Sequence, residues 1–92
     1  MINTHNNDKR FVYVYFNRNE PEKIRRVVAA HVQYWKTANL IGYMGGPFGD
    51  RTGGLISFVA ASLAEATDII LHDPFVLEDL IAQKWIKDWL AE

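Results

Sequence analysis

The stretch Phe11-Val-Tyr-Val-Tyr-Phe16 decides the fold of this 92-residue chain, because all six residues are β-branched or aromatic. Such residues favour β-strands, and polar residues bound the run on both sides. Both faces of this predicted strand are apolar, whereas an antiparallel strand with one solvated face alternates apolar and polar residues. We therefore expect both faces of the sheet to be covered.

Helix and strand patterns follow the first strand in a regular order. Pro21 and Glu22 are typical of a helix start, apolar spacing extends this helix to about Ile41, and Gly42 ends it. A second helix opens with Ser62 and Glu65 arranged as a capping box. The remaining predicted elements are strands over residues 43–48 and 55–61, joined by a glycine-rich hairpin over 49–54, and a strand in the middle of 80–90.

This order predicts an α+β fold, the ferredoxin-like β-α-β-β-α-β arrangement, with one antiparallel sheet and both helices on one face. Residues 11–92 would form a single domain behind a flexible N-terminal tail, residues 1–10. A domain of this size buries only roughly 60–65% of its unfolded surface. The second apolar face of the sheet therefore indicates a homodimer, in which another copy of the chain covers that face.

Composition excludes several kinds of function. The net charge is −1, and 10 basic and 11 acidic residues are spread along the chain, which argues against a nucleic-acid partner. An RNA-recognition motif shares the topology, but the expected aromatic pair is missing. The absence of cysteine excludes disulfides and Cys-based metal sites. Neither a signal peptide nor a membrane-spanning stretch is present, so we expect no membrane partner and a cytoplasmic location.

Two residues are candidates for chemistry. His31 lies in the apolar stripe of the first helix, four residues from both Val27 and Trp35, so it should point inward. Its structural alternative is a core histidine whose nitrogens are satisfied internally. Asp73 precedes Pro74 and is a good helix N-cap. The histidine spacing and the lack of a phosphate-binding glycine motif predict no metal and no cofactor.

Several short motifs, taken together, resemble a known family. They are Gly46-Pro47-Phe48, Gly54, Ser62-Leu63 with Ala66, and Asp73-Pro74-Phe75, with His31 upstream. Their order and spacing resemble the YCII-related family of dimeric α+β barrel proteins, over nearly the whole chain from residue 11. The resemblance implies that His31 and Asp73 form an acid/base pair. Members often carry Ser or Thr at the position of Gly54, which leaves open whether the site has a hydroxyl here; Ser57 and Thr52 are the possible substitutes.

The resemblance also implies a class of reaction, since relatives include a dehydrochlorinase that acts on a hydroxylated aromatic ring. We expect a small-molecule lyase or isomerase that abstracts a proton next to a carbonyl, with His31 as acid/base and Asp73 orienting it. The alternative is a non-catalytic dimeric module that binds a small ligand. The residues expected to contact the ligand are Tyr13, Tyr15, Gly46, Pro47 and Phe75.

Overall fold

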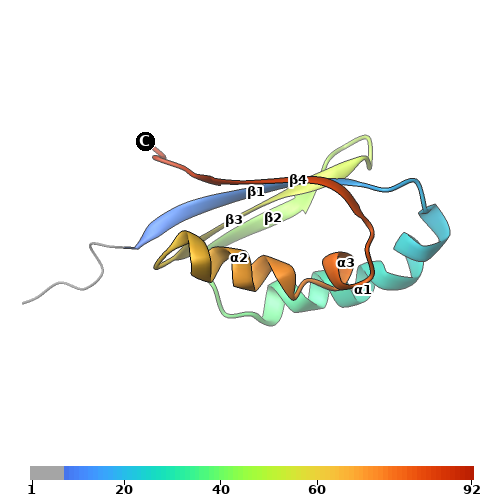
Figure 1. Cartoon of the computed structure of the whole chain (residues 1–92), viewed down its shortest axis with the longest axis horizontal. Helices are drawn as coiled ribbons and strands as arrows, with labels where there is room; N and C mark the ends of the chain where they lie inside the picture. The colour runs from blue at the N-terminus through green and yellow to red at the C-terminus, as the bar shows by residue number, and fades with distance from the viewer. Residues whose placement is uncertain (1–7) are drawn as a thin grey trace, which may run out of the picture.

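The computed structural model describes residues 8–92, whose four strands form one antiparallel sheet in the order β2-β3-β1-β4. The elements are β1 (Lys9–Asn17), α1 (Pro21–Thr37), β2 (Ile41–Pro47), β3 (Gly53–Ala60), α2 (Leu63–Leu71), α3 (Pro74–Leu77) and β4 (Ile81–Asp88). The helices α1, α2 and α3 lie on one face of the sheet (Figure 1). The predicted ferredoxin-like α+β fold is confirmed.

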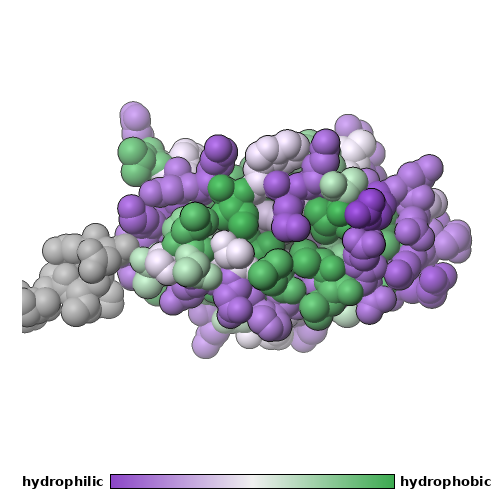
Figure 2. Space-filling view, viewed as in Figure 1, coloured by the Kyte–Doolittle hydropathy of each residue, from purple (hydrophilic) through white to green (hydrophobic). Residues whose placement is uncertain are grey.

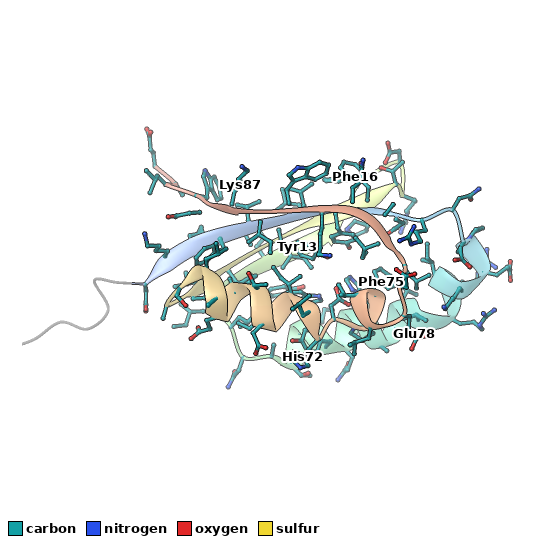
Figure 3. The ribbon with its side chains drawn as sticks, in the orientation of Figure 1. Tyr13, Phe16, His72, Phe75, Glu78 and Lys87 are labelled. Carbon is teal, nitrogen blue, oxygen red and sulfur yellow. The ribbon has the colours of Figure 1, made fainter. Side chains whose placement is uncertain are left out.

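Strand β1 is central, because it pairs with β3 on one side and with β4 on the other. Its alternate residues Phe11, Tyr13 and Tyr15 are buried against the helices. Figure 3 shows Tyr13 between the sheet and the helices, and Phe16 on the opposite side of the sheet. The side chains of β1 thus reach two different environments, as their alternation along a strand requires.

The core lies between the sheet and the helices. Its largest fully buried apolar side chains are Trp35, Tyr13, Phe11, Phe58, Ile56, Ile70 and Leu80. Each such burial contributes roughly 1.5–3 kcal/mol. These side chains come from α1, α2, the strands β1 and β3 and the turn before β4, so the core joins the sheet to the helices.

Other apolar side chains remain exposed. On the sheet face away from the helices, Met44 is 74% exposed and Trp85 46% exposed. On the helical side Leu63 and Leu77 are also exposed, and Figure 2 shows hydrophobic side chains gathered over α2 and α3. Within residues 8–92 no helix is long and apolar enough to cross a bilayer.

The predicted end of the first helix is wrong. Helix α1 stops at Thr37, and Asn39 adopts a left-handed conformation with φ 62°. Asparagine tolerates this conformation well and often ends helices. Ile41 begins β2 instead, and Gly42, with φ 64°, lies at a register shift inside that strand.

The other boundaries differ less. Strand β1 starts at Lys9, so residues 9 and 10 are not part of a tail, while residues 1–7 lie outside the described part of the chain. Helix α2 has the predicted cap, since the Ser62 hydroxyl accepts a hydrogen bond from the Glu65 backbone N–H at 3.1 Å. The ambiguous C-terminal segment contains the predicted strand, β4.

We predict that Tyr13→Phe does not destabilise the protein. The Tyr13 hydroxyl is fully buried and has no hydrogen-bond partner among residues 8–92. Leaving a buried polar group unpaired costs about 1–3 kcal/mol, so its removal should raise the free energy of unfolding or leave it unchanged. Urea denaturation measures this quantity. A loss above ~1 kcal/mol would contradict the interpretation of an unpaired hydroxyl.

Candidate functional site

The fully buried carboxylate of Asp73 accepts hydrogen bonds from three donors. The His31 Nδ1 lies 2.8 Å from Oδ1, the Trp35 Nε1 2.9 Å from Oδ2, and the Phe75 backbone N 2.9 Å from Oδ1. The last bond makes Asp73 the N-cap of α3, as its place before Pro74 predicts. Because an ionised carboxylate only accepts, we assign the proton on this side of the imidazole to Nδ1.

The ring of His31 is fixed on two sides. It stacks on Phe75 with ring centroids 3.9 Å apart and an interplanar angle of 10°. Tyr15 meets it edge-on, and the Tyr15 hydroxyl lies 3.3 Å from His31 Nε2. His31 and Trp35 are four residues apart on α1 and therefore share one face of the helix, which is why both reach Asp73.

A cavity of about 390 Å³ opens beside His31, between α1 and the inner face of the sheet. Its volume falls within the range of about 300–1,000 Å³ that is usual for small-ligand sites. The lining residues that bear on its chemistry are Tyr15, His31, Lys36, Tyr43, Arg51 and Phe75. A larger hollow of about 660 Å³ lies on the opposite face of the sheet, and neither His31 nor Asp73 reaches it.

Burial and electrostatics keep the nearby tyrosines neutral. Burial, and after it the charge of Asp73, raises the pKa of Tyr15 to about 12. The pKa of Tyr43, which also lines the cavity, is raised by burial and then by Asp73. Near pH 7 both hydroxyls therefore keep their protons and can act as hydrogen-bond donors.

Of the five residues predicted to contact a ligand, four line the cavity together with His31: Tyr15, Gly46, Pro47 and Phe75. Tyr13 does not reach it. Its ring is fully buried and stacks on Tyr15 with centroids 5.2 Å apart, so Tyr15 is the tyrosine that faces the cavity.

Neither Ser57 nor Thr52, the two possible substitutes for the missing hydroxyl, lines the cavity beside His31. Ser57 lines the hollow on the opposite sheet face and accepts a hydrogen bond from Arg10 Nη1 at 2.9 Å. The Thr52 hydroxyl donates to Asp50 Oδ1 at 2.7 Å and does not line the cavity beside His31. The hydroxyl next to the histidine belongs to Tyr15.

Sequence reasoning missed the roles of Trp35, Lys36, Tyr43 and Arg51. Trp35 had a usable signal, because a residue four positions after an inward histidine shares its helix face. Tyr43 and Arg51 had no such signal in the sequence, since they reach the cavity only through the pairing of β2 with β3. Within residues 8–92 no group of three or more His, Cys, Asp or Glu side chains could hold a metal ion.

The model of the YCII-related domain matches residues 9–90. The chain belongs to the YCII-related domain family. No curated protein matches it. The family assignment covers the strand that carries Tyr15, the helix that carries His31 and the turn that carries Asp73.

Similar solved structures support the same fold. One is the dehydrochlorinase TftG of Burkholderia phenoliruptrix AC1100, which acts on 5-chloro-2-hydroxyhydroquinone and was solved in complex with 2,5-dihydroxybenzoquinone. Its sequence is 23% identical, and the superposition has a TM-score of 0.79 and covers 90% of this chain and 95% of TftG. A putative antibiotic biosynthesis monooxygenase of Bacteroides thetaiotaomicron is 13% identical with a TM-score of 0.66, covering 94% and 90%. These neighbours have the dimeric α+β barrel type of fold.

We predict that Asp73→Asn lowers the free energy of unfolding by about 2–4 kcal/mol, because the amide nitrogen cannot accept a hydrogen bond and leaves a buried donor unpaired. The matched control is Asp68→Asn, where the side chain is 76% exposed, and it should change stability by less than about 0.5 kcal/mol. Urea denaturation of both variants measures the difference. Equal stability of the two would show that the buried network contributes nothing.

Proposed function

We propose that this protein is a small-molecule lyase or isomerase in which His31 is the acid/base and Asp73 orients it. The proposal rests on one observation: His31 is hydrogen-bonded to Asp73 through Nδ1, at 2.8 Å, and also lines a cavity of about 390 Å³. With Nδ1 occupied, only Nε2 can exchange a proton with a ligand. Fixing one tautomer in this way suits a general base.

The reaction that fits is proton abstraction from a carbon next to a carbonyl. The C–H proton goes to His31 and the electron pair forms an enolate. In an elimination this pair then expels a leaving group from the neighbouring carbon, and in an isomerisation the proton returns at another carbon. In both cases the buried carboxylate of Asp73 stabilises the imidazolium that forms.

The charge of the cavity supports an anionic intermediate. Lys36 and Arg51 line it, and no carboxylate is among the lining residues within the part of the chain that the structure describes. Neither cationic side chain forms an ion pair with another residue in 8–92. Two cations beside an aromatic cavity favour a planar ligand whose oxygens carry negative charge.

The similarity to TftG indicates which compounds to test first, and it does not identify the substrate. That enzyme acts on a chlorinated hydroxyhydroquinone and binds a dihydroxybenzoquinone, which are planar rings with acidic hydroxyls. Such compounds match the aromatic lining and the two cations of the cavity described here.

We also propose that the protein is a homodimer joined through the sheet face away from the helices. This face presents Val12, Val14, Phe16, Leu55 and Trp85, on adjacent strands paired in register. Phe16 and Trp85 pack edge-to-face with centroids 5.9 Å apart, forming a preorganised aromatic surface. A contiguous apolar face of this kind is stabilised by a self-complementary partner.

We predict that His31→Gln lowers turnover at least ~100-fold while the protein stays folded, because glutamine can still donate to Asp73 but cannot serve as a base. Two assays measure turnover. The first follows chloride release from 5-chloro-2-hydroxyhydroquinone. The second follows, by NMR in D₂O, the exchange of C–H protons of 2,5-dihydroxybenzoquinone and of an unsaturated lactone. The matched control is His72→Gln, one residue before Asp73, whose side chain is 62% exposed.

Other results of these assays would favour one of the alternative roles of the protein. Saturable binding of 2,5-dihydroxybenzoquinone by wild-type protein, with no elimination or exchange of any probe, would indicate a ligand-binding module. No binding and no turnover, with His31→Gln losing only stability, would indicate that the pair is structural. Equal turnover by His31→Gln and wild type would exclude the histidine as the base.

For the dimer, we predict that light scattering gives wild-type protein twice the 10.6 kDa chain mass, and that Trp85→Glu weakens association at least ~100-fold by burying a charge at the interface. Leu77→Glu is the control, because Leu77 is 65% exposed but lies on the helical side. A monomeric wild-type protein, or a dimer that Trp85→Glu leaves intact, would refute the proposed interface.

A further inference from the structure

We infer that the Tyr15 hydroxyl is a catalytic group that relays the proton between the ligand and His31. This inference rests on the proposed function. It assigns a chemical role to a side chain that the sequence indicates only as a ligand contact, and it changes which protein atom meets the reacting proton.

The hydrogen bonds of His31 set which ring nitrogen accepts from Tyr15. Its Nδ1 faces the Asp73 carboxylate at 2.8 Å, so this nitrogen carries the proton of the neutral ring. Its Nε2 is then an acceptor, and the Tyr15 hydroxyl, 3.3 Å away, is its donor. Catalytic hydrogen bonds are often this long without a ligand and shorten when one binds. The basic nitrogen is therefore covered by a hydroxyl group.

The packing of its ring holds Tyr15 in place. Its side chain is only 4% exposed, stacks on Tyr13 with ring centroids 5.2 Å apart, and meets Phe75 edge-on at 6.3 Å. Swinging the ring away from Nε2 would break these contacts and open a void in the core. Tyr15 and His31 both line the cavity, so we place the Tyr15 hydroxyl between His31 Nε2 and a ligand bound there.

The neighbouring strand leaves room for the Tyr15 hydroxyl. Gly54 is the cross-strand partner of Tyr15 in the β1–β3 pairing. A Cβ atom at Gly54 would lie 2.5 Å from Tyr15 Oη and 2.7 Å from the Gly46 carbonyl oxygen. Such distances are far below van der Waals contact, so a side chain at position 54 would displace the hydroxyl from His31.

The relay balances as follows. The ligand C–H or O–H proton moves to Tyr15 Oη while the original Tyr15 proton moves to His31 Nε2. The products are the ligand anion, a neutral Tyr15 and an imidazolium hydrogen-bonded to Asp73. The transfers are concerted, because burial raises the pKa of Tyr15 to about 12 and a free phenolate is unfavourable near pH 7.

The test is Tyr15→Phe, which removes the hydroxyl and keeps the ring, with Tyr13→Phe as the matched control on the same strand face. Chloride release from 5-chloro-2-hydroxyhydroquinone should show kcat lowered at least ~100-fold in Tyr15→Phe, with KM changed less than ~3-fold. Tyr13→Phe should keep kcat within ~2-fold of wild type, since its hydroxyl has no partner in residues 8–92 and does not reach the cavity.

A proton inventory, in which kcat is measured across mixtures of H₂O and D₂O, distinguishes a proton relay through Tyr15 from a merely structural role. Because the C–H proton of the ligand does not exchange with solvent before the step, wild-type protein should show a linear plot with a solvent isotope effect from the Tyr15 proton, and the residual activity of Tyr15→Phe should show no such effect. Full activity of Tyr15→Phe together with loss of activity in His31→Gln would overturn the relay alone. No turnover by wild-type protein would overturn the proposed function, and the relay with it.

A measurement without substrate tests the starting geometry. In ¹⁵N NMR of wild-type protein, His31 should be the tautomer with the proton on Nδ1, and the Nε2 resonance should shift in Tyr15→Phe but not in Tyr13→Phe. A proton on Nε2, or an Nε2 resonance unchanged in Tyr15→Phe, would overturn the relay while leaving His31 as the proposed base.

Discussion

The arrangement of the helices depends on the buried carboxylate of Asp73. Two of its donors, His31 and Trp35, come from α1, and the third is the backbone N–H of Phe75 in α3. A buried carboxylate is tolerated only when its oxygens are paired, and removing one partner is strongly destabilising. The hydrogen bonds therefore fix how α1 rotates against α3. The same rotation places His31 beside the cavity, so the helix packing and the proposed chemistry depend on one side chain.

Strand β1 contributes side chains to both faces of the sheet. Its alternation directs Tyr15 toward the helices and Val14 and Phe16 toward the opposite face, where the proposed dimer interface lies. Because the side-chain period of a strand is two, a slip of one residue would exchange the two sets. Pairing with β3 and β4 on both sides fixes this register. Covering the outer face with a second copy would therefore also stiffen the strand that carries Tyr15.

Sequence patterns predicted the elements better than the contacts between them. The β-branched and aromatic run at 11–16 predicts a strand, the spacing around His31 predicts an inward side chain, and the structure matches both predictions. The end of α1 was missed because Leu40 and Ile41 continue the apolar spacing past Asn39, whose left-handed conformation stops the helix. The bond between His31 and Asp73 spans 42 residues, so no local pattern contains it. The family resemblance alone indicated that the two belong together.

The position of Gly54 shows what such long-range pairing adds. A glycine inside a strand costs about 0.5–1 kcal/mol relative to alanine, so it needs a compensating reason in the tertiary structure. Antiparallel pairing places Gly54 opposite Tyr15, and the missing side chain leaves space that the Tyr15 hydroxyl occupies. The two positions are therefore coupled: a larger residue at 54 would require a side chain at 15 that does not reach His31. The glycine is explained by the hydroxyl beside it rather than by the flexibility of its hairpin.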